Sequence, residues 1–246
     1  IESSVLFIQK GGSAIGDGAG DTGELLYALS LILALVGLVT GIAGLLRGRS
    51  SLEDRRTDVR ALALASLFAA LCYIGFSFFK IDIPVGTEKT AFHLGNVFCV
   101  LAALFLGGLW GGMAGAVGMT IADLTSGYVT SAPKTFLLKL CIGLIVGLVA
   151  RCVFHLDREQ RPRKRVLGTV VSTACGMAFN VVADPVVGYF YKTYVLGVPQ
   201  DAAATWAKIG AVTTLVNAVV AVAVASAFYL ALRPALEHAG LLKKAV

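Results

Sequence analysis

The basic residues of this chain are gathered on every second connection between apolar stretches. Seven apolar stretches run through the sequence, at about 24–46, 60–79, 94–107, 108–126, 135–155, 166–191 and 205–232. Fourteen of the 21 Lys and Arg residues lie in segments 47–60 and 151–165 and in the C-terminal part from Arg233 onward. This alternation is typical of α-helical membrane proteins, whose cytoplasmic loops hold the positive charge. With 57% hydrophobic and 15% charged residues, we predict an all-α integral membrane protein.

The same charge pattern predicts an orientation. If every stretch crosses the bilayer once, the three basic segments share one side, which the positive-inside rule makes cytoplasmic. The loops 80–93, 127–134 and 192–204 then lie outside. We therefore expect a multi-pass protein of the plasma membrane with its N-terminus outside and its C-terminus in the cytoplasm. The net charge of +6 follows from this topology, and it gives a role with nucleic acid little weight.

Residues 94–126 form one apolar run that glycines interrupt at 107, 108, 111 and 112. A helix needs roughly 20 residues to cross a bilayer, so this run fits two short helices joined by a tight turn. A single long helix would invert the charge alternation downstream. We therefore predict two helices, which gives a core of six over residues 60–235. A polar segment 1–23, an extra transmembrane helix 24–46, a basic linker 47–59 and a tail 236–246 complete the organisation.

Motifs of the common catalysts are missing from the sequence. It has no HExxH, GxSxG or Walker motif, and its five cysteines and three histidines show no metal-ligand spacing. We therefore predict neither an enzyme nor a protein with a metal or other cofactor. An intramembrane enzyme stays open as a rival, with Asp184 and His93 as its least unsuitable pair.

The polar residues inside the spans are few. A charged side chain there costs at least ~2.5–3.5 kcal/mol on insertion scales, so each such residue needs a reason. By position along their helices they fall in the outer half of the membrane or near its middle, whereas the inner half reads as nearly pure Leu, Val, Ala and Gly. The residues concerned are Asp123, Lys139, Asn180, Asp184, Trp206, Thr213 and Asn217.

A polar cluster that opens outward above an apolar inner half predicts a binding pocket rather than a continuous pore. Four aromatic residues, Tyr128, Tyr189, Tyr191 and Trp206, are expected around its mouth. The alternative is that these polar groups only satisfy each other, with Asp123 paired to Lys139 and Asn180 bonded to a neighbouring backbone.

Small residues recur at helical spacing. Ala61, Ala65 and Ala69 form a stripe at i, i+4 and i+8, and similar glycine stripes occur in the fourth and fifth stretches. Small residues let helix backbones approach closely. Internal packing accounts for the glycines, while the alanine stripe fits either internal packing or contact with another protein.

Several of these segments together resemble a known family. Phe92-His-Leu-Gly-Asn96, Gly107-Gly-Leu-Trp-Gly-Gly112, the run from Gly118 to Asp123, and Ala132-Pro-Lys-Thr135 followed by Lys139 are similar to the substrate-binding S components of energy-coupling factor (ECF) vitamin transporters. The alanine stripe resembles the family's A-x-x-x-A docking motif. The resemblance covers residues 60–235, whereas the stretch 24–46 is additional to the family's six helices.

The resemblance implies a mechanism. An S component binds a micronutrient from outside, occludes it beneath the loop between its first two core helices, and works with a coupling membrane subunit and two ABC-type ATPases. That loop is Lys80–His93 here, with its bend expected at 84–86. Asn96 then joins the candidate substrate-binding residues, and Ala61, Ala65 and Ala69 become candidates for docking.

The sequence leaves the substrate open among riboflavin-type, pantothenate-type and pyrimidine-like molecules, with a slight preference for the first two. The rival function is a self-sufficient secondary transporter of a small organic solute. Such a transporter usually shows inverted repeats with broken helices and midplane charges, and no convincing repeat is visible in the sequence.

Overall fold

The computed structural model describes residues 59–85 and 88–239. The predicted N-terminal segment 1–23, the extra helix 24–46, all but the last residue of the linker 47–59, and residues 240–246 of the tail lie outside the described residues. The six-helix core predicted for 60–235 falls within them.

The described residues form six α-helices, close to the stretches that the sequence predicts. Apolar helical segments long enough to cross a membrane are Val129–Val153, Pro162–Val195 and Gln200–His238, and the all-α membrane class is confirmed. Short π-helical turns, Val149–Val153 and Tyr191–Val195, continue two of the helices. The α-helices are α3 (Val59–Ser77), α4 (Gly95–Leu106), α5 (Gly108–Thr125), α6 (Ala132–Leu148), α7 (Pro162–Phe190) and α8 (Gln200–His238).

The apolar run 94–126 forms two helices, as predicted, and the break lies at Gly107. This residue has φ +88°, a left-handed conformation that glycine adopts without the steric cost of a Cβ atom. Its N–H donates to the carbonyl of Ala103, and Arg151 lies against its Cα and donates to the carbonyl of Phe105 at 3.1 Å. The chain therefore reverses direction within one residue.

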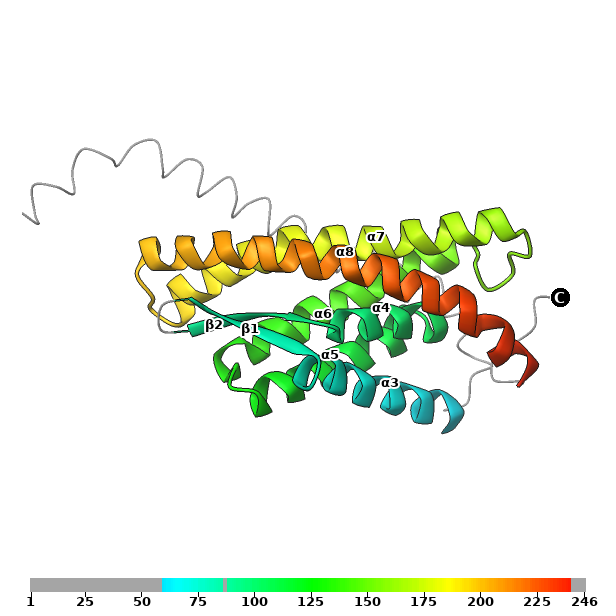
Figure 1. Cartoon of the computed structure of the whole chain (residues 1–246), viewed down its shortest axis with the longest axis horizontal. Helices are drawn as coiled ribbons and strands as arrows, with labels where there is room; N and C mark the ends of the chain where they lie inside the picture. Colours follow the sequence, from blue (N-terminus) through cyan, green and yellow to red (C-terminus); the bar gives the residue numbers. More distant parts are fainter. Residues whose placement is uncertain (1–58, 86–87, 240–246) are drawn as a thin grey trace, which may run out of the picture.

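Glycines set how closely the helices approach. A Cβ atom on Gly143 of α6 would overlap the backbone of Gly112 in α5, and one on Gly118 of α5 would overlap the carbonyl of Ala69 in α3. Helix α5 therefore touches both α3 and α6 almost backbone to backbone, which strengthens dispersion contacts where no hydrophobic effect operates between lipid-embedded helices. The prediction of internal packing by the glycines is confirmed. Helices α7 and α8 run side by side across the other face of this group (Figure 1).

The loop predicted as 80–93 is an antiparallel hairpin of β1 (Lys80–Val85) and β2 (Glu88–His93). Lys80 pairs with His93 and Pro84 pairs with Lys89. Pro84 and Val85, where the bend was expected to begin, still belong to the strand. A two-stranded ribbon consists of edge strands, where a proline without an N–H is tolerated.

The two ends of the molecule differ in charge. The hairpin, the α5–α6 connection and the α7–α8 connection lie at one end, which we call the hairpin end (Figure 1). The start of α3, the segment 151–165 and the end of α8 lie at the other, the basic end. The connections that the sequence assigns to opposite sides of the membrane thus lie at opposite ends of the fold.

The half of the core toward the basic end is more polar than predicted. Thr169, Ser172, Thr173 and Ser226 are buried there, which corrects the expectation of nearly pure apolar residues. Ser172 donates to the carbonyl of Gly168 at 2.6 Å, and Thr173 lies 3.1 Å from the hydroxyl of Ser226. A hydroxyl that bonds within its own helix or across to a neighbour needs no water, so hydropathy alone did not reveal these residues.

Candidate ligand-binding site

A hollow lies beneath the hairpin, between the hairpin-end halves of the helices. Its empty space measures about 870 Å³, counting the part open to solvent. All eight residues predicted to bind substrate line it. They are Asn96, Asp123, Lys139, Asn180, Asp184, Trp206, Thr213 and Asn217.

Aromatic side chains border this hollow on several sides. Phe76 of α3, Tyr128 of the α5–α6 connection and Trp206 of α8 line it. The ammonium nitrogen of Lys192 lies 3.8 Å from the centroid of the Trp206 ring, a cation–π contact. Of the four aromatics expected at the mouth, Tyr189 and Tyr191 are not among the lining residues, although Gly188 and Lys192 on either side of them are.

Asp184 is already paired. Its Oδ1 lies 2.7 Å from the Lys134 ammonium, and its Oδ2 accepts a hydrogen bond of 2.8 Å from Thr214. Neither Lys134, which the sequence offered only as part of the segment 132–135, nor Thr214 was among the predicted binding residues. Their positions in the sequence could have identified them. Lys134 lies in the first turn of α6, the helix that also carries Lys139, and Thr214 directly follows Thr213; all four line the hollow.

Lys139 is the buried cation of the site. Only 6% of it is exposed, and its ammonium makes one long contact of 3.5 Å, to Oδ1 of Asn180. An ammonium carries three donors. The alternative in which Asp123 pairs with Lys139 is not realised, because no such ion pair forms among the described residues. Lys139 therefore has donor capacity directed at the hollow.

Three buried polar atoms that belong to lining residues have no hydrogen-bond partner in the described part of the chain. They are Nδ1 of His93, Oδ1 of Asn96 and Oδ2 of Asp123. Buried polar atoms in folded proteins are nearly always paired, and leaving one unpaired costs about 1–3 kcal/mol. A bound molecule with matching groups would remove this cost.

Asn217 attaches the hairpin to α8. Its amide nitrogen donates to the carbonyl of Ala91 at 3.0 Å, and its Oδ1 accepts from the N–H of His93 at 3.0 Å. The side chain therefore pairs with β2 much as a neighbouring strand would. Thr213, one turn earlier, donates its hydroxyl to the carbonyl of Ile209 at 3.0 Å, which leaves its oxygen lone pairs as acceptors.

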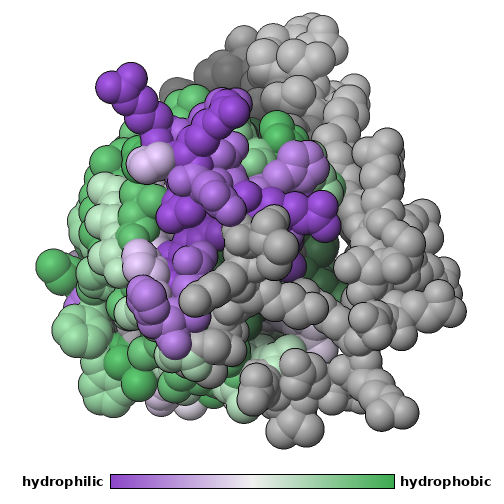
Figure 2. Space-filling view, turned by 90° about the vertical axis from the view of Figure 1, so that its right-hand side faces the viewer, coloured by the Kyte–Doolittle hydropathy of each residue, from purple (hydrophilic) through white to green (hydrophobic). Residues whose placement is uncertain are grey.

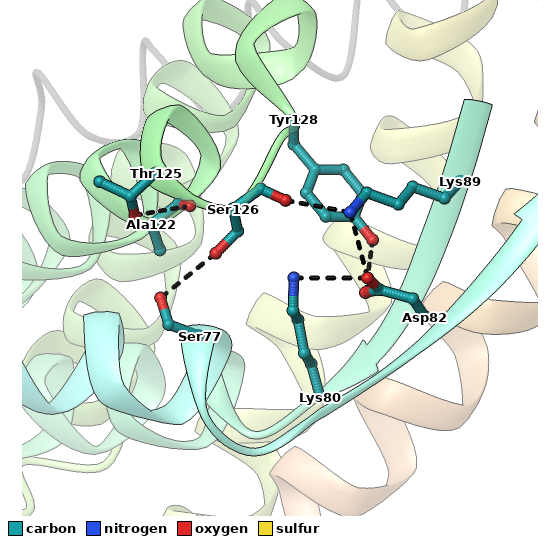
Figure 3. Close-up of polar contacts among 8 residues, drawn as sticks. All are labelled: Ser77, Lys80, Asp82, Lys89, Ala122, Thr125, Ser126 and Tyr128. Atoms are coloured by element: carbon teal, nitrogen blue, oxygen red, sulfur yellow. Dashed lines mark hydrogen bonds and ion pairs between the residues drawn. The ribbon is translucent and has the colours of Figure 1, made fainter. Parts of the chain in front are cut away.

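A second set of contacts holds the hairpin to the α5–α6 connection (Figure 3). Asp82 lies 3.4 Å from Lys80 and 3.1 Å from Lys89, and it accepts a hydrogen bond of 2.8 Å from Tyr128. Lys89 also donates to the carbonyl of Ser126 at 3.1 Å. Partial burial favours a higher pKa for Asp82, but the bond from Tyr128 and the two lysines outweigh it and lower that pKa. The hairpin is thus closed over the hollow.

His93 belongs to the site although the sequence analysis did not include it among the binding residues. Burial lowers its pKa to about 3, with the nearby charge of Lys139 adding to the effect, so the ring is neutral. A neutral imidazole offers one donor and one acceptor. Its ring centroid lies 4.6 Å from that of Phe76. Its position at the end of the hairpin, three residues before Asn96, is the sequence signal that could have identified it as a binding residue.

The alanine stripe of α3 lies along the contact with α5. Ala65 is 7% exposed and belongs to the core, while Ala61 and Ala69 are half-buried. The carbonyl of Ala69 faces Gly118. The stripe therefore serves internal packing at Ala65 and Ala69, and its role in docking stays a prediction.

The fold and the site define a membrane-embedded helix bundle with a polar hollow at one end. A family model, ECF-type riboflavin transporter, S component, matches residues 56–234. The chain belongs to this family, which confirms the resemblance to ECF S components; it is a family of transport proteins and not of enzymes.

One curated relative is an uncharacterized protein in a gap 3′ region of Pyrococcus woesei. It is 32% identical over 124 residues, which cover 50% of this chain and 73% of the relative. No solved structure matches the chain.

Proposed function

We propose that this chain is the substrate-binding subunit of an ATP-driven ECF importer and that its ligand is riboflavin. The observation that carries the proposal is the hollow beneath the hairpin, with unpaired polar atoms on Asn96, Asp123 and His93 and a donor on Lys139. The family description names riboflavin, and the chemistry of the hollow suits it.

The unpaired atoms favour riboflavin over a pantothenate-type ligand. Asn96 and Asp123 present acceptors, which call for O–H or N–H donors, and Asp123 would repel a carboxylate nearby. Riboflavin is uncharged and has a ribityl chain with hydroxyl donors, an imide N–H and ring acceptors for Lys139. Its flat ring system suits the aromatic faces of Phe76, Tyr128 and Trp206.

We infer that the hairpin end faces outside and the basic end faces the cytoplasm, since the segment 151–165 carries six basic residues against two acidic ones. The C-terminus is then cytoplasmic, and the odd number of predicted spans places the N-terminus outside. The partners proposed are a coupling membrane subunit and two ABC-type ATPases. Docking through Ala61, Ala65 and Ala69 would use the accessible edge of the stripe, because Ala65 itself is buried.

Direct titration tests the ligand. Riboflavin fluorescence should be quenched at one ligand per chain when the purified protein is added, because a ring held against Trp206 or Tyr128 loses excitation to the aromatic side chain. Excess pantothenate should not reverse the quenching. Saturable binding of pantothenate without binding of riboflavin would refute the proposed ligand. Riboflavin uptake into vesicles that hold this chain without ATPases would instead support a secondary transporter.

Acidification should weaken riboflavin binding through His93. In the closed hairpin the pKa of His93 is about 3, whereas an exposed histidine has a pKa of about 6.5. Below pH ~6.5 the open form therefore takes up a proton that the closed form does not, so closure becomes less favourable as the pH falls and is unaffected above that value. The dissociation constant should rise by up to about tenfold per pH unit between pH 6.5 and 5.

The control for this pH dependence is His93→Gln, which keeps polar groups but does not titrate. Its affinity should be lower at pH 7.5 and should vary less with pH down to pH 5. Asp82 is not the source of the effect, because its lowered pKa keeps it ionised throughout this range. An unchanged pH profile in His93→Gln would show that another group controls closure.

A further inference from the structure

The basic end holds a second crevice, far along the bundle from the hollow beneath the hairpin. It measures about 830 Å³, counting its open part, and is formed by the π-helical turn that follows α6, the 154–161 connection and the start of α7. Figure 2 shows hydrophilic side chains gathered on this end of the molecule beside a hydrophobic flank. Its lining residues are Val153, Phe154, His155, Arg158, Glu159, Lys164 and Leu167.

The polar side of this crevice carries positive charge. Arg158 and Lys164 are exposed, and no carboxylate lies within ion-pair distance of either among the described residues. The acidic lining residue Glu159 accepts from the backbone N–H of Arg161 at 2.8 Å through Oε1, which fixes its carboxylate but leaves its charge. The crevice thus presents two cations and a histidine against one carboxylate, an excess of positive charge.

The connection that carries these cations is held firmly. Its backbone carbonyl at Glu159 accepts from Nε and Nη2 of Arg165, at 3.1 and 2.8 Å. The carbonyl of Leu156 accepts from Arg233 of α8. Arg158 and Lys164 therefore project from a fixed backbone, which lowers the ordering cost of binding an anion.

The other side of the crevice is apolar and exposed. Val153 is 61% exposed and Leu167 is 57% exposed, and both belong to helical segments whose apolar length fits a membrane span. Cationic and apolar groups thus meet in one crevice at the level where a span ends. The same change from charge to hydrocarbon occurs within a single glycerophospholipid.

We propose that this crevice binds an anionic glycerophospholipid. The phosphate lies between Arg158 and Lys164, and an acyl chain follows Val153 and Leu167 into the bilayer. Basic pockets between transmembrane helices commonly take such headgroups. A soluble anion would use the cations but not the apolar side, and a zwitterionic lipid would bring a choline or ethanolamine cation against them.

Native mass spectrometry of the detergent-solubilised protein tests the lipid, with dioleoylphosphatidylglycerol and dioleoylphosphatidylcholine as probes. The phosphatidylglycerol adduct should survive at collision energies that remove phosphatidylcholine. The double variant Arg158→Gln/Lys164→Gln should bind phosphatidylglycerol about 10–30-fold more weakly. Arg163→Gln removes one positive charge at the same end outside the crevice, and it should change binding less than threefold.

Other outcomes would overturn the proposal. If inorganic phosphate displaces phosphatidylglycerol at equal concentration, the crevice is a site for soluble anions. If both lipids bind equally, the crevice does not select an anionic lipid. If Arg163→Gln weakens binding as much as the double variant, binding depends on the overall positive charge of this end and not on the crevice. Riboflavin titration of each variant checks its folding and should be unchanged, because that hollow is at the opposite end.

Discussion

Lys139→Met should reduce riboflavin affinity by about 10–150-fold, the equivalent of losing one charged hydrogen bond worth about 1.5–3 kcal/mol. Lys139 is buried and makes one contact of 3.5 Å, to Asn180, so a ligand oxygen is the natural acceptor for its remaining donors. Methionine has a similar length and no charge. Because a buried cation with one weak partner is costly, the midpoint of thermal unfolding without ligand should stay the same or rise. Fluorescence titration and a melting curve on one sample measure both quantities.

Two other lysines make this result specific. Lys208→Met, on an exposed position of α8 outside the hollow, should leave both quantities unchanged. Lys134→Met removes the partner of Asp184 and should lower stability as well as affinity, because it leaves a half-buried carboxylate unpaired. If Lys139→Met lowered stability without lowering affinity, Lys139 would be a structural residue and the ligand contact would be wrong.

Arg233→Met should lower the free energy of unfolding by about 3–5 kcal/mol, as expected when one partner of a buried polar network is removed. Arg233 is 3% exposed. It donates to Glu237 at 2.6 Å, to the hydroxyl of Tyr229 at 2.8 Å and to the carbonyls of Leu156 and Asp157. These bonds tie the end of α8 to the connection that leads into α7. Their loss would leave the acceptors of both segments unpaired.

Unfolding in detergent, followed by loss of helical signal against temperature, measures this effect. Arg163→Met changes an exposed arginine at the same end and should shift the midpoint by far less. Riboflavin affinity of Arg233→Met measured well below its midpoint should match that of the parent protein, since the hollow lies at the other end. Equal midpoints for the two variants would show that the Arg233 network contributes little to stability.

The helices could be predicted because their cause is local. A span is recognised from about 20 apolar residues in succession, and its direction from the charges beside it. The separation of α4 from α5 was predictable for the same reason, because glycines interrupt the apolar run and the downstream charges exclude a single helix. The composition of the candidate site was also predictable, since a polar residue within an apolar span is conspicuous.

The pairing of these polar residues was not predictable from the sequence. Asp123 and Lys139 are opposite charges on neighbouring helices, yet the ion pair forms between Lys134 and Asp184. Which charges meet depends on the rotation and spacing of α6 and α7, and these follow from contacts such as Gly143 against Gly112. The burial of Thr169 and Ser172 was not predicted. A hydroxyl that bonds to a carbonyl of its own helix needs no partner elsewhere, so these residues do not stand out in the sequence.

The sequence by itself determined that this chain spans a membrane, which stretches of it form the helices, and which residues would need partners inside it. Each of these follows from the transfer of a side chain from water to hydrocarbon, which depends mainly on residue type. The tertiary structure alone decided that Asn217 holds β2, that the hairpin closes over the hollow and that His93 lies within it. These are contacts between residues as many as 126 positions apart, and they depend on how all the helices are packed together.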